Sequence, residues 1–320
     1  MNATTEDRVI AWLMDGDPAV RWQVMRDLLH LPERTWRRER LRVAKTGWGR
    51  RLLDRQRADG NWGRGLYRPK WTCTTYTMQL LRQLGLPPGD PSALRACALY
   101  LDQGLGSDGG INFWGPRRRI GEACVTGMIL AQVSWFGTED PRIERLVEYL
   151  LHEQMPDAGW NCRRPQGAVH SSFHTTTSVL EGLHGYAAAK GRGAREVLAA
   201  AARGLEFLAE HRLFRSHTTG RVVSSELTKL HFPPHWRHDV LRALDLLQSV
   251  RAPRDPRLEE AVAIVRSRRR RDGRWGLARP YPGAVHFALE ATGAPSRMNT
   301  LRALRVLAWW DRRESLPSVE

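Results

Sequence analysis

Residues of metal-binding type recur at a regular interval along the chain. Cys73, Cys124 and His174 follow one another roughly fifty positions apart. Thiolate and imidazole are ordinary zinc ligands, and three protein ligands with an open fourth position are typical of catalytic zinc. The structural alternative is that the cysteines are buried and unreactive and that the histidine caps a helix. Cys162 and His170 lie between Cys124 and His174 and are additional ligand candidates.

A second polar cluster contains Glu226, His231, His235 and His238. Two prolines between His231 and His235 prevent a single helix from carrying both. We expect a helix to begin after these prolines, so that His235 and His238, three positions apart, share one face. Either histidine could then act as a general base, and a capping or surface role is the alternative.

The elements that must position these residues are marked by a repeated phrase of acidic residue, glycine and tryptophan. The phrase has a period of about fifty residues and predicts five units. Its copies include residues 56–63, 107–114, 154–160 and 270–276.

Each unit contains two segments with the 3.6-residue period of helices. The first is apolar and expected to be inner: 71–84, 121–135, 172–183, 235–247 and, more weakly, 285–292. The second carries charge on one face and is expected to be outer: 91–101, 141–153, 196–208, 256–265 and 299–310. Asp-Pro pairs at 90–91, 140–141 and 255–256 predict capped helix starts. Consecutive helix pairs joined by short links are expected to curl into a ring or a curved solenoid.

An amphipathic segment at 17–29 precedes the repeats and resembles a unit of a HEAT repeat. We therefore expect two regions, an N-terminal helical cap over residues 1–49 and a toroid repeat domain over residues 50–320.

The Gln…Asp-Gly-x-Trp-Gly phrase and the helix pairing resemble the terpenoid cyclase and protein prenyltransferase superfamily, which includes squalene-hopene cyclases. This resemblance implies an all-α, α/α-toroid fold over about residues 50–310, with the N-terminal ends of the inner helices facing a central cavity. It also implies a transferase, lyase or isomerase acting on an isoprenoid diphosphate or a similar amphiphile.

The prenyltransferase zinc site is similar to Glu122-Ala123-Cys124 followed by His174. When the family's site is carried over residue by residue, the resemblance implies that Glu122, Cys124 and His174 are the zinc ligands and that Arg119 contacts the diphosphate. Zinc would lower the pKa of a bound thiol or water and so supply a nucleophile. The chain departs from the family in having Glu122 in place of aspartate, Val125 in place of an aromatic residue and Cys73 in place of a histidine. The acidic motif of triterpene cyclases is absent, which argues against cyclisation started by protonation, and no magnesium or nucleotide motif is present.

Aromatic and basic residues close to the predicted inner helices are candidates for binding substrate. Aromatic faces stabilise cations, and arginines near helix starts suit a diphosphate. The candidates are Lys70, Trp71, Cys73, Tyr76, Arg119, Arg163, Arg164, Trp236 and Arg237. By contrast, the tryptophans of the repeated phrase, Trp62, Trp160 and Trp275, are expected to tie one unit to the next.

The 320 residues include 50 Lys and Arg against 34 Asp and Glu, a formal net charge of +16 that favours an anionic partner. The N-terminus does not resemble a secretory signal, no apolar run is long enough for a membrane span, and four cysteines suit a reducing compartment, so we expect a cytoplasmic protein. The alternatives to an enzyme are a ligand- or protein-binding scaffold and nucleic-acid association, which we rank last because the sequence contains no recognised reading module. Whether a protein partner is required is open.

Overall fold

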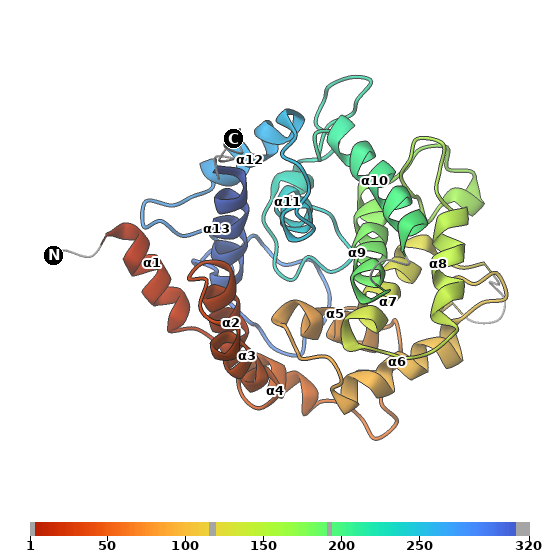
Figure 1. Ribbon diagram of the computed structural model, residues 1–320, viewed down its shortest axis with the longest axis horizontal. Coiled ribbons are helices and arrows are strands. Elements are labelled where there is room, and N and C mark those ends of the chain that lie inside the picture. The colour runs from red at the N-terminus through yellow and green to blue at the C-terminus, as the bar shows by residue number, and fades with distance from the viewer. Residues whose placement is uncertain (1–3, 115–119, 191–193, 312–320) are drawn as a thin grey trace, which may run out of the picture.

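The computed structural model describes residues 4–114, 120–190 and 194–311, and all regular secondary structure in these ranges is helical. The helices form a closed ring of two layers (Figure 1). The predicted all-α toroid is therefore confirmed.

Within the described ranges, six helices form the inner layer of the ring. They are α2 (Pro18–Asp27), α5 (Thr74–Leu84), α7 (Ala123–Phe136), α9 (Phe173–Lys190), α11 (Val240–Ser249) and α13 (Arg297–Asp311). The contacts α5 with α7, α7 with α9, α11 with α13, and α13 with α2 follow the ring around. Two side-chain contacts complete the ring. Between α2 and α5, the Trp22 indole donates a hydrogen bond to the carbonyl of Leu84 at 3.0 Å, and between α9 and α11, Arg242 forms an ion pair with Glu181.

The other helices form the outer layer. They are α1 (Thr5–Met14), α3 (Glu33–Leu41), α4 (Gly47–Leu53), α6 (Pro91–Gly104), α8 (Ile143–His152), α10 (Arg195–Glu210) and α12 (Glu259–Ser267). Short 3₁₀ turns lie at η1 (Arg42–Ala44), η2 (Arg164–Gln166), η4 (Ser225–Thr228) and η5 (Pro256–Leu258).

Local sequence explains where several helices begin and end. Asp17 and Asp90 each accept a backbone hydrogen bond as N-caps, and each precedes a proline in the first turn. Gly85 and Gly137 end α5 and α7 in the left-handed region, with φ of 88° and 72°, where a residue without a side chain is favoured.

The repeated phrase links consecutive helices, as predicted. The indoles of Trp62, Trp160 and Trp275 each donate a 2.7 Å hydrogen bond to the carbonyl of the residue ten positions earlier, at the end of an outer helix. Their backbone N–H groups each donate at 3.0 Å to a threonine in the first turns of the next inner helix, for example Thr176 in the case of Trp160. Because all three indoles are fully buried, they fasten the outer layer to the inner layer.

Two helix predictions near the C-terminus are wrong. Residues 285–292 form no helix, since prolines at 280, 282 and 295 and glycines at 283 and 293 leave too short a segment. Instead, Ala284 exchanges backbone hydrogen bonds of 2.8 and 3.1 Å with Trp71 and Lys70. The segment 299–310, expected to be outer, belongs to inner helix α13, and its charged face lines the inside of the ring.

The first 49 residues contribute helices to both layers. Val9, Leu13, Trp22 and Val43 belong to the same continuous hydrophobic core as the repeats. The division into 1–49 and 50–320 stays a prediction, and the packing across it is continuous.

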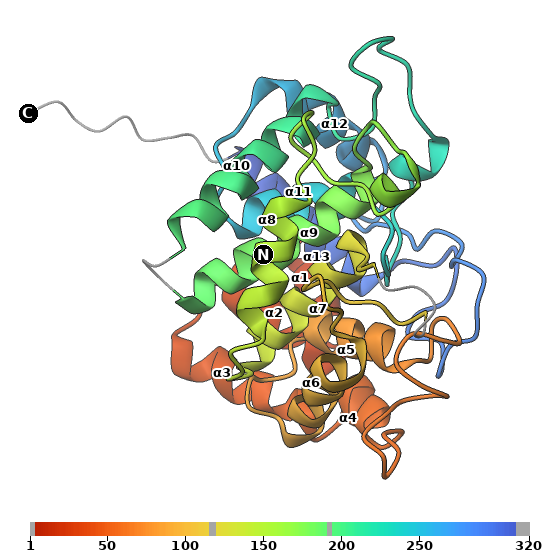
Figure 2. The ribbon, with the colours of Figure 1, turned by 90° about the vertical axis from the view of Figure 1, so that its right-hand side faces the viewer.

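One end of the ring is closed by residues 229–239, which we call the plug segment. The loops that precede the inner helices gather on one face (Figure 2), and the plug segment runs inside the ring (Figure 1). Gln79 of α5 donates to the carbonyl of His235 at 2.7 Å, and Asn299 of α13 donates to the carbonyl of Leu230 at 3.0 Å. The plug segment is thus anchored to two inner helices, α5 and α13.

Candidate functional site

A cavity of about 1090 Å³ occupies the inside of the ring on the other side of the plug segment. Its walls come mainly from the C-terminal halves of α2, α5, α7, α9 and α11 and from α13. Phe232 and Pro234 of the plug segment line it from within. Volumes of this order hold small-molecule ligands.

Glu181 of α9 is shared by two guanidinium groups. Nε of Arg242 donates to Glu181 Oε1 at 2.8 Å, and Nη2 of Arg82 donates to Oε2. Burial alone would raise the pKa of Glu181, but the charges and hydrogen bonds of Arg242 and Arg82 outweigh it and lower the pKa to about 2. Glu181 is therefore ionised at neutral pH and cannot act there as a proton donor.

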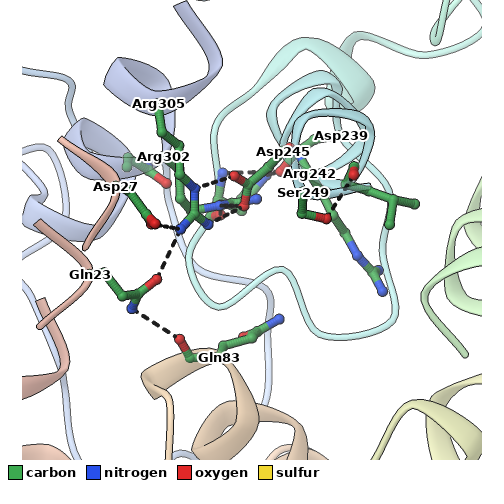
Figure 3. Close-up of polar contacts among 12 residues, drawn as sticks. Gln23, Asp27, Gln83, Asp239, Arg242, Asp245, Ser249, Arg302 and Arg305 are labelled. Atoms are coloured by element: carbon green, nitrogen blue, oxygen red, sulfur yellow. Dashed lines mark hydrogen bonds and ion pairs between the residues drawn. The ribbon is translucent and has the colours of Figure 1, made fainter. Parts of the chain in front are cut away.

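Asp245 of α11 is shared in the same way by Arg302 and Arg305 of α13 (Figure 3). Burial alone would raise the pKa of Asp245, but the two guanidinium groups have the larger, opposite effect. The pKa of Asp245 is therefore below its ordinary value. Arg305 also donates to Asp27 at 3.1 Å and to Gln23 at 3.0 Å. This network joins α11, α13 and α2 across the cavity wall.

The cavity carries a surplus of positive charge. Among the described residues, seven arginines line it, together with the carboxylates of Asp27, Glu181 and Asp245. Each of these carboxylates is paired with two guanidinium groups. Because charges interact more strongly in a partly enclosed space than in water, this surplus favours an anionic guest.

Apolar side chains complete the walls. The cavity is lined by Trp22, Ala131, Trp135, Ala187, Phe232, Leu246 and Met298. Apolar surface beside an arginine network can accommodate a molecule with an anionic head and an apolar body.

Many of the predicted site residues lie at the closed, N-terminal face instead. The expectation that the inner helices open onto the cavity at their N-terminal ends is therefore wrong, because the plug segment fills that end. Trp71 stacks on His235 with ring centroids 3.9 Å apart, and Tyr76 packs edge-on against both rings. Cys73 is the N-cap residue of α5 and is fully buried, which raises the pKa of its thiol to about 11.

His235 and His238 do not lie on a helix, contrary to the prediction, since α11 begins only at Val240. His235 has a positive φ of 53°, and His238 Nε2 hydrogen-bonds to the carbonyl of Leu213 at 2.7 Å. Burial lowers the pKa of His235 to about 3 and that of His238 to about 4. Both are neutral, buried parts of the closed face.

His174 is held by the same cluster. Its Nδ1 accepts a 2.8 Å hydrogen bond from the backbone N–H of His238, and its ring packs edge-on against Trp236. Burial first, and then the charges of His238 and Arg237, lower the pKa of His174 to about 3. Because its Nδ1 already accepts the hydrogen bond from His238, that atom is unavailable as a metal ligand.

Cys124 lies beside Cys162, with a hydrogen bond between the two thiols. Glu122 is the N-cap residue of α7 and is close enough for its charge to act on both. Across the ranges described, no group of three or more His, Cys, Asp or Glu side chains is arranged to hold a metal ion. The donor set therefore does not fit the zinc site that the resemblance implied. His170, the further ligand candidate, is exposed, and its backbone carbonyl accepts a hydrogen bond from the Asn161 side chain.

The predicted basic residues are dispersed. Lys70 is half-buried, with Nζ 5.4, 5.7 and 5.5 Å from the ring centroids of Tyr67, Trp71 and Trp236. Arg237 packs over Trp236 and Tyr281. Arg163 is exposed and Arg164 pairs with Glu153 at 3.0 Å, while Arg119 lies outside the described residues.

Sequence reasoning missed the residues that line the cavity. The available signal was the presence of charged residues inside otherwise apolar inner helices. These residues are Arg82, Glu181, Arg242, Asp245, Arg302 and Arg305.

No protein-family model matches the sequence, and no curated protein matches it. Similar solved structures include a protein from Actinoplanes, with 17% identity over 96% of this chain and 98% of the other and a TM-score of 0.46. They also include the type II terpene cyclase MstE from Scytonema, with 16% identity over 95% of this chain and 96% of the other and a TM-score of 0.46. A variant of that cyclase in complex with geranylgeranyl dihydroxybenzoate gives 17% identity, 95% coverage of both chains and a TM-score of 0.45. Among the described helices, none is long and apolar enough to span a membrane.

Proposed function

We propose that this protein is a terpenoid-cyclase-like toroid that binds an isoprenoid or similar amphiphile with an anionic head in its central cavity. The observation that carries the proposal is the lining of the cavity, in which seven arginines face three carboxylates beside apolar walls. The arginines would bind the head, and the apolar walls would bind the body of the ligand.

The same lining favours one kind of chemistry over another. Protonation of an alkene needs an acid that is protonated before the reaction, and the pKa values of Glu181 and Asp245 are both lowered by guanidinium groups. Guanidinium groups instead stabilise an anion as it departs from carbon. We therefore propose ionisation as the reaction that this cavity supports. The C–O bond breaks with both electrons going to the anionic leaving group, and the resulting carbocation is captured by water, which releases a proton to solvent; no step is assigned to zinc.

Binding is tested by calorimetry with farnesyl diphosphate, farnesol and inorganic diphosphate. The cavity predicts tighter binding of farnesyl diphosphate than of either part alone. Ala188 is exposed and lines the cavity, so Ala188→Phe should weaken farnesyl diphosphate binding at least tenfold and leave inorganic diphosphate binding unchanged. The matched control is Ala199→Phe, on an exposed position of α10 that does not line the cavity. Wild-type protein that does not bind farnesyl diphosphate would contradict the proposal.

Catalysis is tested separately, by following release of inorganic diphosphate from bound farnesyl diphosphate. Release that is faster than in buffer and that Ala188→Phe reduces supports an enzyme. Binding without release supports the alternative, a ligand-binding scaffold.

A further inference from the structure

Arg40 of α3 lines the cavity between two indole rings. Its Cζ lies 5.2 Å from the ring centroid of Trp22 and 4.8 Å from that of Trp135. Nε donates to the carbonyl of Gly85 at 2.8 Å, and Nη2 donates to the carbonyl of Leu86 at 3.4 Å. These contacts fix the plane of the guanidinium group.

Arg40 has no carboxylate partner among the residues described by the structure. Nε and Nη2 bind these backbone carbonyls, whereas Nη1 binds no protein group among the described residues and is not fully buried. Nη1 is therefore the nitrogen of this cavity-lining residue that is left to donate to a guest. Burial, reinforced by the charges of Arg26 and Arg37, lowers the pKa of Arg40 to about 10, which leaves the group charged at neutral pH.

A second guanidinium group packs on the same indole. Cζ of Arg26 lies 4.6 Å from the ring centroid of Trp22, and Arg26 also lines the cavity. Arg26 donates through Nε and Nη2 to Asp27, which also accepts from Arg305. Asp27 is thus shared by Arg26 and Arg305, whereas Arg40 has no carboxylate partner among the described residues.

We infer that Arg26 and Arg40 form a subsite for the phosphate-type head of the amphiphile that binds in the cavity, an inference that rests on the proposed function. An anion between the two guanidinium groups would relieve their mutual repulsion and accept hydrogen bonds from nitrogens not committed to protein partners. The indole faces of Trp22 and Trp135 exclude water from both sides of Arg40, which strengthens its attraction for the anion. A phosphate or diphosphate carries more charge than a carboxylate and suits the positive surplus of the cavity better.

The subsite also fixes the direction of the ligand. Arg26 and Arg40 come from α2 and α3, whereas Ala187 and Leu246 lie on α9 and α11. The head would lie at the α2 and α3 side, and the apolar body would extend toward α9 and α11.

The test is equilibrium binding of farnesyl diphosphate and farnesol to wild type, Arg40→Gln, Arg26→Gln and Arg38→Gln. Arg38 lies on the same helix, is exposed and does not line the cavity, so it is the matched control. We expect Arg40→Gln and Arg26→Gln each to weaken farnesyl diphosphate binding at least tenfold and to change farnesol binding less than twofold. Arg38→Gln should leave the binding of both compounds unchanged. Arg40→Lys, which keeps the charge and loses the planar fork, should recover part of the affinity.

The outcomes separate this inference from the proposed function. If wild type binds farnesyl diphosphate and both glutamine variants bind it equally well, the subsite is refuted and the cavity proposal stands. If wild type binds neither compound, the proposed function fails and the subsite fails with it. Arg26 is 39% exposed in its side chain, so Arg26→Gln decides the question even where Arg40→Gln does not fold.

Discussion

Trp71 and His235 stack with their ring centroids 3.9 Å apart and their planes inclined by 6°. Trp71 precedes α5 and His235 lies in the plug segment before α11, so the stack joins two distant parts of the ring. The stack lies at the N-terminal face with many of the predicted histidines and cysteines, and neither of its two rings lines the arginine-lined cavity. The sequence predicts one site at the N-terminal ends of the inner helices. In the structure, the predicted cysteines and histidines lie at that face, and the arginine-lined cavity lies on the other side of the plug segment.

The buried histidines predict a loss of stability well above the usual acid range. His174 and His235 have pKa values lowered to about 3, and His238 has one lowered to about 4, chiefly by burial. Unfolding restores their ordinary pKa of about 6.5, so the unfolded state binds more protons below that pH. Stability is complete above pH 6.5 and falls as the pH drops toward 4, by up to about 1.4 kcal/mol per pH unit for each histidine. Urea unfolding midpoints at pH 7.5, 6.5 and 5.5 measure this.

His235→Asn provides the control for that prediction. Asparagine tolerates the positive φ of 53° and cannot be protonated. The variant should lose part of the slope with pH, whatever its absolute stability. An unchanged slope would show that His235 does not contribute to it.

Trp160→Phe should destabilise the ring. The change removes the hydrogen bond to the Leu150 carbonyl, leaves that buried acceptor unpaired and opens a small cavity, at a cost of about 2–4 kcal/mol. The free energy of unfolding in urea is the measurement. Trp114→Phe, at a position 38% exposed, should cost less than about 1 kcal/mol. Equal effects of the two changes would contradict the linking role of Trp160.

The sequence predicts the repeating architecture well because the repeated phrase acts locally. Trp62, Trp160 and Trp275 make equivalent hydrogen bonds over equal sequence separations, so a regular spacing translates directly into a regular fold. The last unit departs from the pattern. The charges on 299–310 indicate an outer helix, but Arg302 and Arg305 are neutralised by Asp245, a partner far away in the sequence that only the closed ring brings near.

The candidate site is predicted less well, for a related reason. Cys73, Cys124 and His174 do recur near the starts of inner helices, yet spacing along the chain does not determine which ring end stays open. The plug segment decides that, and its path depends on contacts such as Gln79 with His235 that have no local signature.

Cys162 should be the most reactive cysteine. A hydrogen bond from the Cys124 thiol, assisted by one from Thr175, lowers the pKa of Cys162 below its ordinary value. Burial instead raises the pKa of Cys73 to about 11 and that of Cys97 to about 12. Alkylation by iodoacetamide at pH 7, followed by peptide mass spectrometry, should label Cys162 first. Its rate should reach half of its maximum at a lower pH than the rate of Cys73 or Cys97, and that midpoint should shift to higher pH in Thr175→Val.

Two results would contradict that assignment. Labelling of Cys73 or Cys97 as fast as Cys162 would show that burial does not control reactivity here. Protection of both Cys124 and Cys162 that a chelator removes would instead support a bound metal.

Asp245→Asn should destabilise the protein and increase its affinity for anions. The change leaves Arg302 and Arg305 without their shared carboxylate inside the ring, and removing one partner of a buried ion pair costs about 3–5 kcal/mol. The cavity also gains one unit of positive charge, so inorganic diphosphate should raise the thermal midpoint of Asp245→Asn more than that of wild type. Asp272→Asn, at an exposed position away from the cavity, should change stability by less than about 0.5 kcal/mol and leave the anion response unaltered. A loss of stability in Asp245→Asn that diphosphate does not reverse would mean that the arginines brace the ring without attracting anions.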